Sequence, residues 1–321
     1  MFAQKQTITK PARVIFYNVE NLFDTINDPE TQDEEFLPAS KNQWNTKKYQ
    51  VKLNHLARVL SSLLDSVQPL AIGLSEIENK AVLEDLIVQP LLKKYNLGIV
   101  HHNSPDERGI DCALLYNKDI LEEVFDAKLT VNFPFETKDK TRDIVYFKGY
   151  MTEEYSIYFF INHWPSRRGE PQESKPKRMV AAKVLKDKLE NLYKGEPYAR
   201  VVMMGDFNDN PTDSSMTFLT EPISKTKKFV NLMAPLYKNG EFTLRYKDQR
   251  DIFDQFVVSE NLLDKKSKYY IQNYKAAIYS PNWLLYNHAK QGLIPNRTYA
   301  SGRWVGGYSD HLPVYFDLIF N

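Results

Sequence analysis

The chain has a single cysteine, Cys112, among its 321 residues. It therefore cannot form an intrachain disulfide, and no Cys-x-x-Cys or Cys/His spacing indicates a zinc site. Cys112 lies in an apolar stretch, so we expect a small buried core residue rather than a catalytic thiol.

Long hydrophobic runs and a charge excess of one sign are also absent. No apolar run approaches the roughly 18 residues that a membrane span needs, so none is expected. The formal net charge is only +1, so any anion-binding surface must be local. The start, residues 1–7, carries no signal peptide, although its short apolar Phe-Ala stub fits the remainder of a trimmed export signal. A secreted or periplasmic location is therefore one alternative.

Aromatic residues are plentiful, with 20 Tyr, 18 Phe and 4 Trp, which is typical of a packed globular protein. No linker and no internal repeat divides the chain, so we expect a single domain over residues 1–321. No pattern indicates an oligomer, and a monomer is the working expectation.

Short runs rich in β-branched and aromatic residues predict strands, and they are separated by two stretches of helical periodicity, 47–65 and 177–193. The predicted strands are 13–18, 70–76, 112–117, 144–151, 156–163, 200–206, 253–259 and 312–320. This order favours an α/β protein in which helices cover mixed sheets. Residues 27–46 and 280–308 read as long loops, which are typically functional or disordered.

Polar side chains follow or precede the predicted strands with unusual regularity. The stretch "VVMMGDFNDNP" (201–211) ends an apolar run on Asp206, with Asn208 just beyond. The same holds for Asn18, Glu76 and His163 at strand ends, and for Asp254, Asp310 and His311 before strand starts. Each alone also fits a turn or a solvated strand end. Together they predict one rim of the sheets where a ligand binds.

The stretches that carry these residues resemble a known family. In chain order they are "FYNVENLF", "LSEIEN", "RGIDCALLYN", "INHWPSR", "GDFNDNP", "FDQFVVS" and "YSDHLPV". The order resembles the endonuclease/exonuclease/phosphatase superfamily, the deoxyribonuclease I-like enzymes, over residues 13–318. The resemblance implies a four-layered α/β sandwich, with two mixed β-sheets face to face and helices outside. It places a phosphoester-cleaving site at one edge.

The resemblance also implies a divalent cation. Glu76 matches the main carboxylate ligand, with Asn18 beside it and Asp310 nearby. Such hard oxygen ligands suit Mg²⁺, with Mn²⁺ or Ca²⁺ as substitutes.

The implied catalytic roles fall on five residues. Asp206 matches the residue that orients or deprotonates the attacking water, and Asn208 the one that helps to hold the phosphate. His311 would contact a phosphate oxygen, with its tautomer fixed by Asp254. His163 matches a second histidine that could protonate the leaving oxygen.

Two positions depart from the family pattern. Ser75 stands where many members have Gln before the metal-binding Glu. Asp111 is an acid where better-known nucleases lack one; it could hold Arg108, which we regard as a substrate-binding candidate, touch the substrate itself, or form a buried structural pair.

Further arginines are candidates for binding substrate. Arg167 and Arg168 follow His163 closely enough to reach the same rim, and Arg offers bidentate contacts to phosphate. Arg303 lies in the loop 296–311, where arginines and aromatics suit stacking on bases or contact with a sugar ring. The same loop also fits a packed lid without ligand contact.

Three functions stay open. The first is a nuclease that cuts nucleic acid. The second is a phosphatase or phosphodiesterase for a small phosphorylated molecule, such as a phosphoinositide or phospholipid head group; the near-neutral charge favours this reading slightly. The third is a non-catalytic binding module, which is disfavoured because Glu76, Asp206 and His311 are all present.

Overall fold

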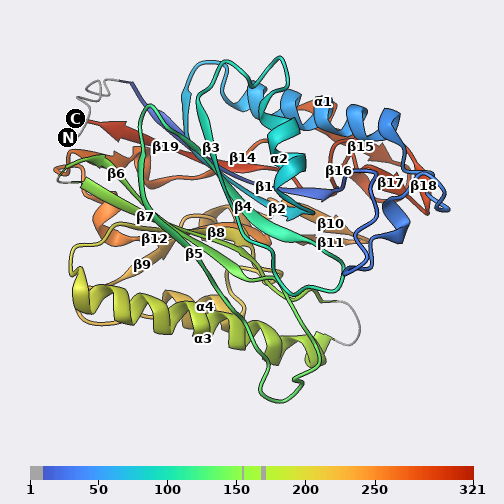
Figure 1. Cartoon of the computed structure of the whole chain (residues 1–321). Coiled ribbons are helices and arrows are strands. Elements are labelled where there is room, and N and C mark those ends of the chain that lie inside the picture. Colours follow the sequence, from blue (N-terminus) through green and yellow to red (C-terminus); the bar gives the residue numbers. More distant parts are fainter. Residues whose placement is uncertain (1–9, 154, 168–170) are drawn as a thin grey trace.

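The computed structural model describes residues 10–153, 155–167 and 171–321 (Figure 1). Arg168 lies outside these residues. Two large sheets form the centre, and each is described below in spatial order.

The first sheet contains β13 (Tyr269–Ile271), β19 (Val314–Phe320), β1 (Ala12–Leu22), β2 (Gln68–Ile77), β4 (Asp111–Asn117) and β3 (Leu97–His101), with β14 (Ala277–Ile278) also paired to β19. The second contains β5 (Glu122–Leu129), β6 (Ile144–Thr152), β7 (Tyr155–His163), β8 (Val201–Asp206), β12 (Asp254–Ser259) and β9 (Phe229–Asn231). In each sheet one inner pair is parallel, β1 with β2 and β7 with β8, and the other pairs are antiparallel.

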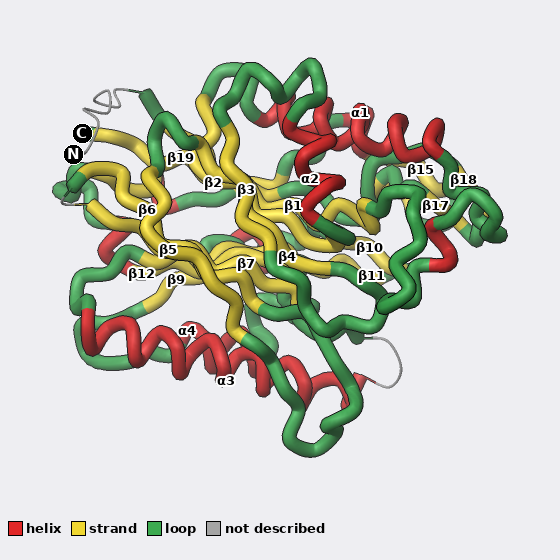
Figure 2. Tube along the Cα trace, in the orientation of Figure 1, coloured by secondary structure: helices red, strands yellow, loops and turns green. Residues whose placement is uncertain are grey.

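Helices cover the outer face of each sheet (Figures 1 and 2). The helices α1 (Thr46–Leu63) and α2 (Lys80–Ile87) pack on the first sheet, and α3 (Pro171–Gly195) and α4 (Ser214–Thr220) pack on the second. Asn45 and Asn79 cap α1 and α2, because each side chain accepts a hydrogen bond from a first-turn N–H. The expected four-layered α/β sandwich is therefore confirmed.

The remaining elements are short. They comprise α5 (Ala234–Lys238), the 3-10 turns η1 (Glu34–Phe36), η2 (Glu260–Leu263), η3 (Gln272–Tyr274) and η4 (Asn282–Leu284), and the hairpins β10–β11 (Leu244–Tyr246, Gln249–Asp251), β15–β16 (Leu285–His288, Gly292–Pro295) and β17–β18 (Tyr299–Ala300, Arg303–Trp304). The last two hairpins and η4 lie in the segment 280–308, which the sequence indicated only as a loop.

The inner faces of both sheets meet in one apolar core. Phe16 and Leu114 from the first sheet lie in the same buried cluster as Phe147, Phe159 and Met204 from the second. Such burial is the main favourable contribution to folding. It also fixes the separation of the sheets at the edge where the predicted rim lies.

Gly205 shows how closely the strands of that edge approach. A Cβ atom at this position would lie 2.3 Å from the carbonyl oxygen of Asn162 on the neighbouring strand. Only glycine fits there without a shift of the backbone, and the next residue along β8 is Asp206.

Cys112 lies in the core as expected, with 1% of its surface exposed. Burial raises the pKa of its thiol far above the usual range. Because the thiolate is the reactive form, we expect no reaction of the folded protein with Ellman's reagent and one equivalent after unfolding in guanidinium chloride. Equal rates in the two states would contradict this placement.

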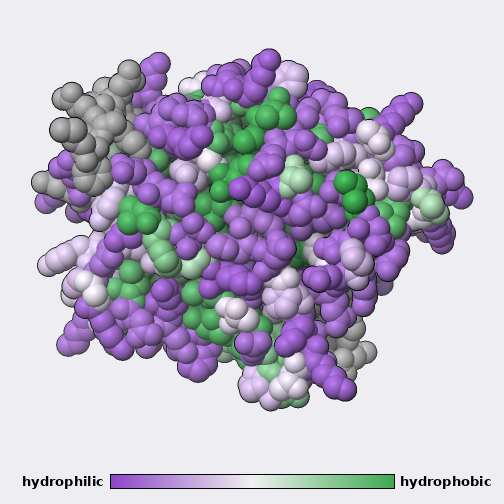
Figure 3. Space-filling model, viewed as in Figure 1, coloured by the Kyte–Doolittle hydropathy of each residue, from purple (hydrophilic) through white to green (hydrophobic). Residues whose placement is uncertain are grey.

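Among the described residues, no helix is long and apolar enough to cross a membrane. The face seen in Figure 3 is mainly hydrophilic, with hydrophobic side chains in scattered groups.

Candidate active site

The predicted rim exists at one edge of both sheets. Asn18 and Glu76 come from the parallel pair β1 and β2, and His163 and Asp206 end the parallel pair β7 and β8. Asp254 begins β12 opposite Asp206 in the antiparallel register, and His311 precedes β19. The rim therefore draws on the carboxyl ends of β2, β7 and β8, on the second half of β1, which runs four residues past Asn18, and on the starts of β12 and β19.

The backbone of this edge is unusual at several positions. Glu20, Asn21, Glu76 and Asn208 all have positive φ angles, of 51°, 58°, 65° and 50°. Non-glycine residues adopt this left-handed conformation at a cost, and such residues cluster at functional sites.

Asn18 connects the two sheets. Its Nδ2 donates hydrogen bonds to Glu76 Oε1 at 3.2 Å and to Asp206 Oδ2 at 3.0 Å, while its Oδ1 accepts from the N–H of Glu20. Ser309 donates a hydrogen bond of 2.7 Å to the carbonyl of Asn18, which ties the C-terminal segment to β1.

Two histidines face one oxygen of Asp206. The Nε2 atom of His163 lies 3.6 Å from Asp206 Oδ2 and 3.9 Å from Glu76 Oε1. The Nε2 atom of His311 lies 3.7 Å from the same Oδ2, and its Nδ1 is hydrogen-bonded to Asp254 Oδ2 at 2.7 Å. Asp254 thus fixes the ring of His311 with Nε2 toward the rim.

Burial and neighbouring charges shift the pKa values of Asp206 and His311. Burial, assisted by the charge of Asp254, raises the pKa of Asp206 to about 6, although His311 opposes the shift. Burial alone would lower the pKa of His311, but the carboxylates of Asp254 and Asp206 outweigh it and hold this pKa well above its usual value. His311 is therefore a cation at neutral pH, and Asp206 is a carboxylate of raised basicity.

The loop after β8 is held firmly. The N–H of Asn208 donates to Asp206 Oδ1 at 2.9 Å, and its Nδ2 donates to the carbonyl of Trp164 at 3.0 Å. Arg167 donates to the carbonyl of Asn208 at 2.8 Å and pairs with Asp209 at 3.0 Å. The structure thus ties Arg167 to this loop, with about a third of its side chain exposed.

Asp310 belongs to a charged network on the other side of the rim. Arg297 contacts Asp310 Oδ2 at 2.9 Å and Glu20 Oε1 at 3.3 Å. Glu20 in turn accepts the N–H of Thr298 at 2.6 Å. The buried Lys52 donates to Thr298 Oγ1 and to the carbonyl of Tyr308, each at 2.7 Å.

The donor set of the rim fits a divalent cation. Glu76 and Asp310 offer carboxylate oxygens, and the side-chain amide of Asn18 lies beside Glu76. Burial and the charge of Asp310 raise the pKa of Glu20 to about 7, a crowding of negative charge that a cation would relieve. Hard, oxygen-rich ligands of this kind suit Mg²⁺ and Ca²⁺.

A second set of candidate metal ligands lies closer together, but two of its members are hydrogen-bonded to each other. Asp206, Asp254 and His311 place ligand atoms within 4.8 Å of one another, the sole such group of His, Cys, Asp or Glu in the described part of the chain. Asp310 is likewise paired with Arg297 and Glu76 accepts from Asn18, so an ion at either place would replace existing contacts.

Two of the other candidate substrate residues pair with neighbours outside this group, although Asp111 stands opposite Ile77 in the register of β4 with β2, next to Glu76. Asp111 is buried and pairs with His101 at 2.9 Å, the structural alternative, while Arg108 contacts Asp106 at 3.3 Å instead. Arg303 is exposed on β18, and within the described residues no hydrogen bond or ion pair connects it to the rim. The nearby Trp304 packs on Trp44, as a lid would.

Sequence reasoning missed several polar residues of the site. Arg142 is buried and donates to the carbonyls of His163 and Trp164 at 3.1 and 2.5 Å. It stands just before β6, so the strand-start pattern that selected Asp254 and Asp310 would also have found it. Glu20 follows the predicted strand 13–18 by two positions, as Asn208 follows Asp206, so the same pattern would have found it; β1 in fact continues to Leu22. Lys52 carried no such signal, because it lies inside a helix.

Gathered at one edge of two face-to-face sheets, these side chains define the class of protein, an enzyme that hydrolyses phosphate esters. Residues 13–319 match the sequence model of the endonuclease/exonuclease/phosphatase family, and the chain belongs to that family.

Solved structures share this fold over nearly the whole chain. They include a D. rerio TDP2 humanized by 14 mutations (16% identity, TM-score 0.57, covering 96% of this chain and 98% of that one). The human Nocturnin catalytic domain with bound sulfate is 16% identical with a TM-score of 0.57, and the match covers 98% of this chain and 96% of that one. A mannosyl-6-phosphatase of Bacteroides thetaiotaomicron is 16% identical with a TM-score of 0.58, and the match covers 96% of this chain and 100% of that one. No curated protein matches the chain by sequence.

Proposed function

We propose that the protein is a magnesium-dependent nuclease that cleaves phosphodiester bonds by attack of an activated water molecule. The observation that supports this best is the pair of imidazole Nε2 atoms of His163 and His311, 3.6 and 3.7 Å from one carboxylate oxygen of Asp206. A base thus stands between two groups that can donate protons, as hydrolysis of a phosphodiester requires.

Asp206 orients the attacking water and accepts its proton. Its raised pKa of about 6 leaves it ionised at neutral pH while making it a better base than an exposed carboxylate, and a catalytic pKa close to the working pH is the favourable arrangement. The N–H of Asn208 holds the other oxygen of Asp206.

The two histidines act on the phosphate. The cationic ring of His311, oriented by Asp254, donates a hydrogen bond to a non-bridging oxygen and stabilises the charge that grows there. His163 protonates the leaving oxygen. One preorganised donor of this kind is worth roughly 3 kcal/mol of barrier.

Glu76 and Asp310, with Asn18, would hold Mg²⁺, and Mn²⁺ or Ca²⁺ are possible substitutes. The ion supplies positive charge for the phosphate oxygens.

Chelation tests the cation. We expect EDTA to lower hydrolysis of bis-p-nitrophenyl phosphate by more than about 100-fold, since metal charge stabilisation is worth several kcal/mol, and Mg²⁺ to restore it. Glu76→Gln should need much more Mg²⁺ for the same rate. Full turnover after exhaustive dialysis against chelator would contradict the assignment.

A panel of substrates tests the nuclease. Plasmid DNA, RNA, inositol phosphates and sugar phosphates are incubated with Mg²⁺ and the wild-type protein, with Asp206→Asn as the blank. Cleavage of nucleic acid above this blank supports the proposal, and its absence alongside turnover of a small phosphate would favour the second candidate.

That second candidate is a phosphatase or phosphodiesterase for a small phosphorylated molecule. The net charge of +1 favours it, because nucleic-acid binding usually draws on a basic surface. The similarity in fold to a mannosyl-6-phosphatase points the same way.

A further inference from the structure

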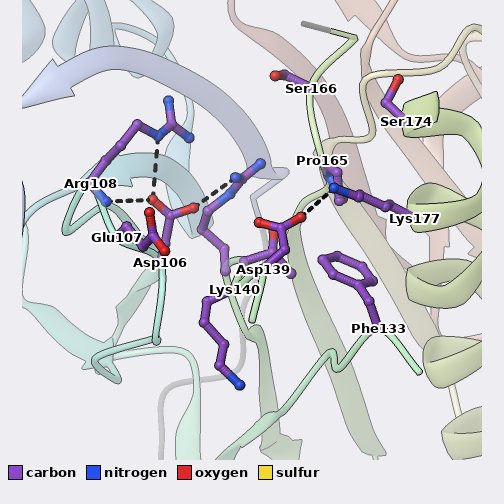
Figure 4. Close-up of a pocket in the computed structure, with 12 residues that line it drawn as sticks. Asp106, Glu107, Arg108, Phe133, Asp139, Lys140, Pro165, Ser166, Ser174 and Lys177 are labelled. Carbon is purple, nitrogen blue, oxygen red and sulfur yellow. Dashed lines mark hydrogen bonds and ion pairs between the residues drawn. The ribbon is translucent and has the colours of Figure 1, made fainter. Parts of the chain in front are cut away.

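A pocket of about 280 Å³ is lined in part by Pro165 and Ser166, which follow His163 by two and three positions (Figure 4). Its walls come from three separate parts of the chain: Asp106, Glu107 and Arg108; Phe133, Asp139, Lys140, Thr141 and Arg142; and Pro165, Ser166, Ser174 and Lys177. Neither the proposed water activation nor the proposed cation site uses these walls.

One carbonyl group separates this pocket from the active site. Arg142, which lines the pocket, donates to the carbonyl oxygen of Trp164 at 2.5 Å, and Asn208 in the active site donates to the same oxygen at 3.0 Å. Arg142 also holds the carbonyl of His163. A substrate whose scissile phosphate lies at His163 would therefore extend over this wall into the pocket.

The pocket carries more positive than negative side chains. The cations are Arg108, Lys140, Arg142 and Lys177, and the acids are Asp106, Glu107 and Asp139.

The acids are largely occupied by these cations, as the dashed lines in Figure 4 show. The two oxygens of Asp106 contact Arg108 and Arg142 at 3.3 and 2.9 Å, and Asp139 contacts Lys177 at 2.5 Å. Lys140 is exposed and has no ion pair within the described residues. Lys177 also pairs with Glu136, just outside the lining, at 2.8 Å, so the charges around the pocket balance. The exposed ammonium group of Lys140 is therefore the feature of this lining that favours an anion.

A buried hydroxyl in the lining is unsatisfied. Thr141 is 3% exposed, and its Oγ1 has no hydrogen-bond partner in the described part of the chain. Buried polar groups nearly always have a partner, so an orphan beside a polar pocket indicates a bound water or ligand there.

We propose that this pocket binds a second, uncleaved phosphate of the substrate, next to the phosphate that is hydrolysed. The inference rests on the proposed phosphoester hydrolysis and adds a preference for substrates with two phosphates. The second phosphate is either the neighbouring one of a nucleic-acid strand or another phosphate on a small molecule, and both have the same oxyanion chemistry.

The test compares substrates with and without the second phosphate. The nucleotide arm uses a thymidine dinucleotide with and without a terminal phosphate, at either end; the sugar arm uses glucose 1,6-bisphosphate and glucose 6-phosphate. The variant is Lys140→Ala/Lys177→Gln. Its matched control is Lys138→Ala/Lys175→Ala, which removes the same charge from exposed positions of the same two segments outside the lining.

In one of the two arms we expect the pocket variant to raise KM for the doubly phosphorylated substrate about tenfold, because a charge-assisted contact is lost. The kcat for this substrate should stay within twofold of the wild-type value. The singly phosphorylated partner and bis-p-nitrophenyl phosphate should change less than twofold, as should every substrate with the control. The responding arm identifies the source of the second phosphate.

The inference is overturned if the pocket variant changes KM equally for the substrates with and without the second phosphate, or if it changes neither. If bis-p-nitrophenyl phosphate is not hydrolysed at all, the proposed function fails instead. The pocket is then judged by calorimetry on the Asp206→Asn background, where the double variant should weaken binding of the phosphorylated dinucleotide or of glucose 1,6-bisphosphate about tenfold. Unchanged binding of both ligands would overturn it.

Discussion

Replacing Asp206 by Asn should lower kcat by roughly three orders of magnitude, as expected when a catalytic base is lost. Asn keeps an oxygen that can accept the N–H of Asn208 but cannot take a proton from water. Steady-state hydrolysis of bis-p-nitrophenyl phosphate with saturating Mg²⁺ measures the change. A loss of less than about tenfold would remove Asp206 from the role of base.

The same substitution should not destabilise the fold. The folded-state pKa of Asp206 lies at about 6, above the ordinary 3.8. The ionised group therefore opposes folding, and stability falls as pH rises from about 3.8 to about 6. In EDTA at pH 8, Asp206→Asn should melt at or above the wild-type temperature. Thermal melts at pH 4 and pH 8 test the sign, since the gain should shrink at the lower pH.

Asp209, three positions along, provides the matched control. It contacts Arg167 at 3.0 Å and Arg178 at 2.8 Å, and it accepts a hydrogen bond from Ser215. Asp209→Asn leaves the buried Arg178 with a neutral partner, so we expect a loss of about 3 kcal/mol in the free energy of unfolding. Of two carboxylates three positions apart, one would thus act in catalysis and the other in stability.

Replacing His311 by Gln should lower kcat by about 10²- to 10⁴-fold, the range for loss of a positioned proton donor. Asp254→Asn should cost nearly as much, because the two residues act through one hydrogen bond of 2.7 Å. The double variant should be little worse than His311→Gln alone, since effects within one unit are not additive. If the loss of kcat in the double variant equals the product of the two single losses, Asp254 acts independently of His311.

The dependence of the hydrolysis rate on pH shows whether Asp254 sets the protonation of His311 or only supports the fold. Asp254 raises the pKa of His311, against the effect of burial. The wild-type cation should therefore persist beyond pH 7 and deprotonate only at higher pH. In the Asp254→Asn variant one carboxylate no longer counteracts the effect of burial, so the pKa of His311 should fall. The alkaline limb of the rate profile should therefore move to lower pH. NMR titration of the His311 ring gives the same shift without turnover.

Much of this site could be predicted because its signals are local. An apolar run that ends on Asp206 or Glu76 shows both the strand and the exposed edge within a few residues. The parallel pairs β1–β2 and β7–β8 then bring such ends together. For the same reason Asn18, Asp254 and His311 were found from short stretches, without knowledge of the sheet order.

The partners of these side chains depend on tertiary packing and could not be predicted. Nothing near Asp111 in the sequence shows that His101, on the neighbouring strand, would claim its carboxylate. Lys52 looks like an exposed helix lysine until Thr298 and Tyr308 close over it. The pocket beside Trp164 is invisible for the same reason, since its walls come from three distant segments.

The hydrogen bond between Ser309 and Asn18 spans 291 positions of the chain, and it has a consequence for biosynthesis. A ribosome delivers Asn18, Glu76 and Asp206 long before Asp310 and His311. The growing chain therefore lacks both the cationic imidazole and the second carboxylate until its final strand emerges. A chain built in this way completes the candidate active site only after its last strand has been synthesised.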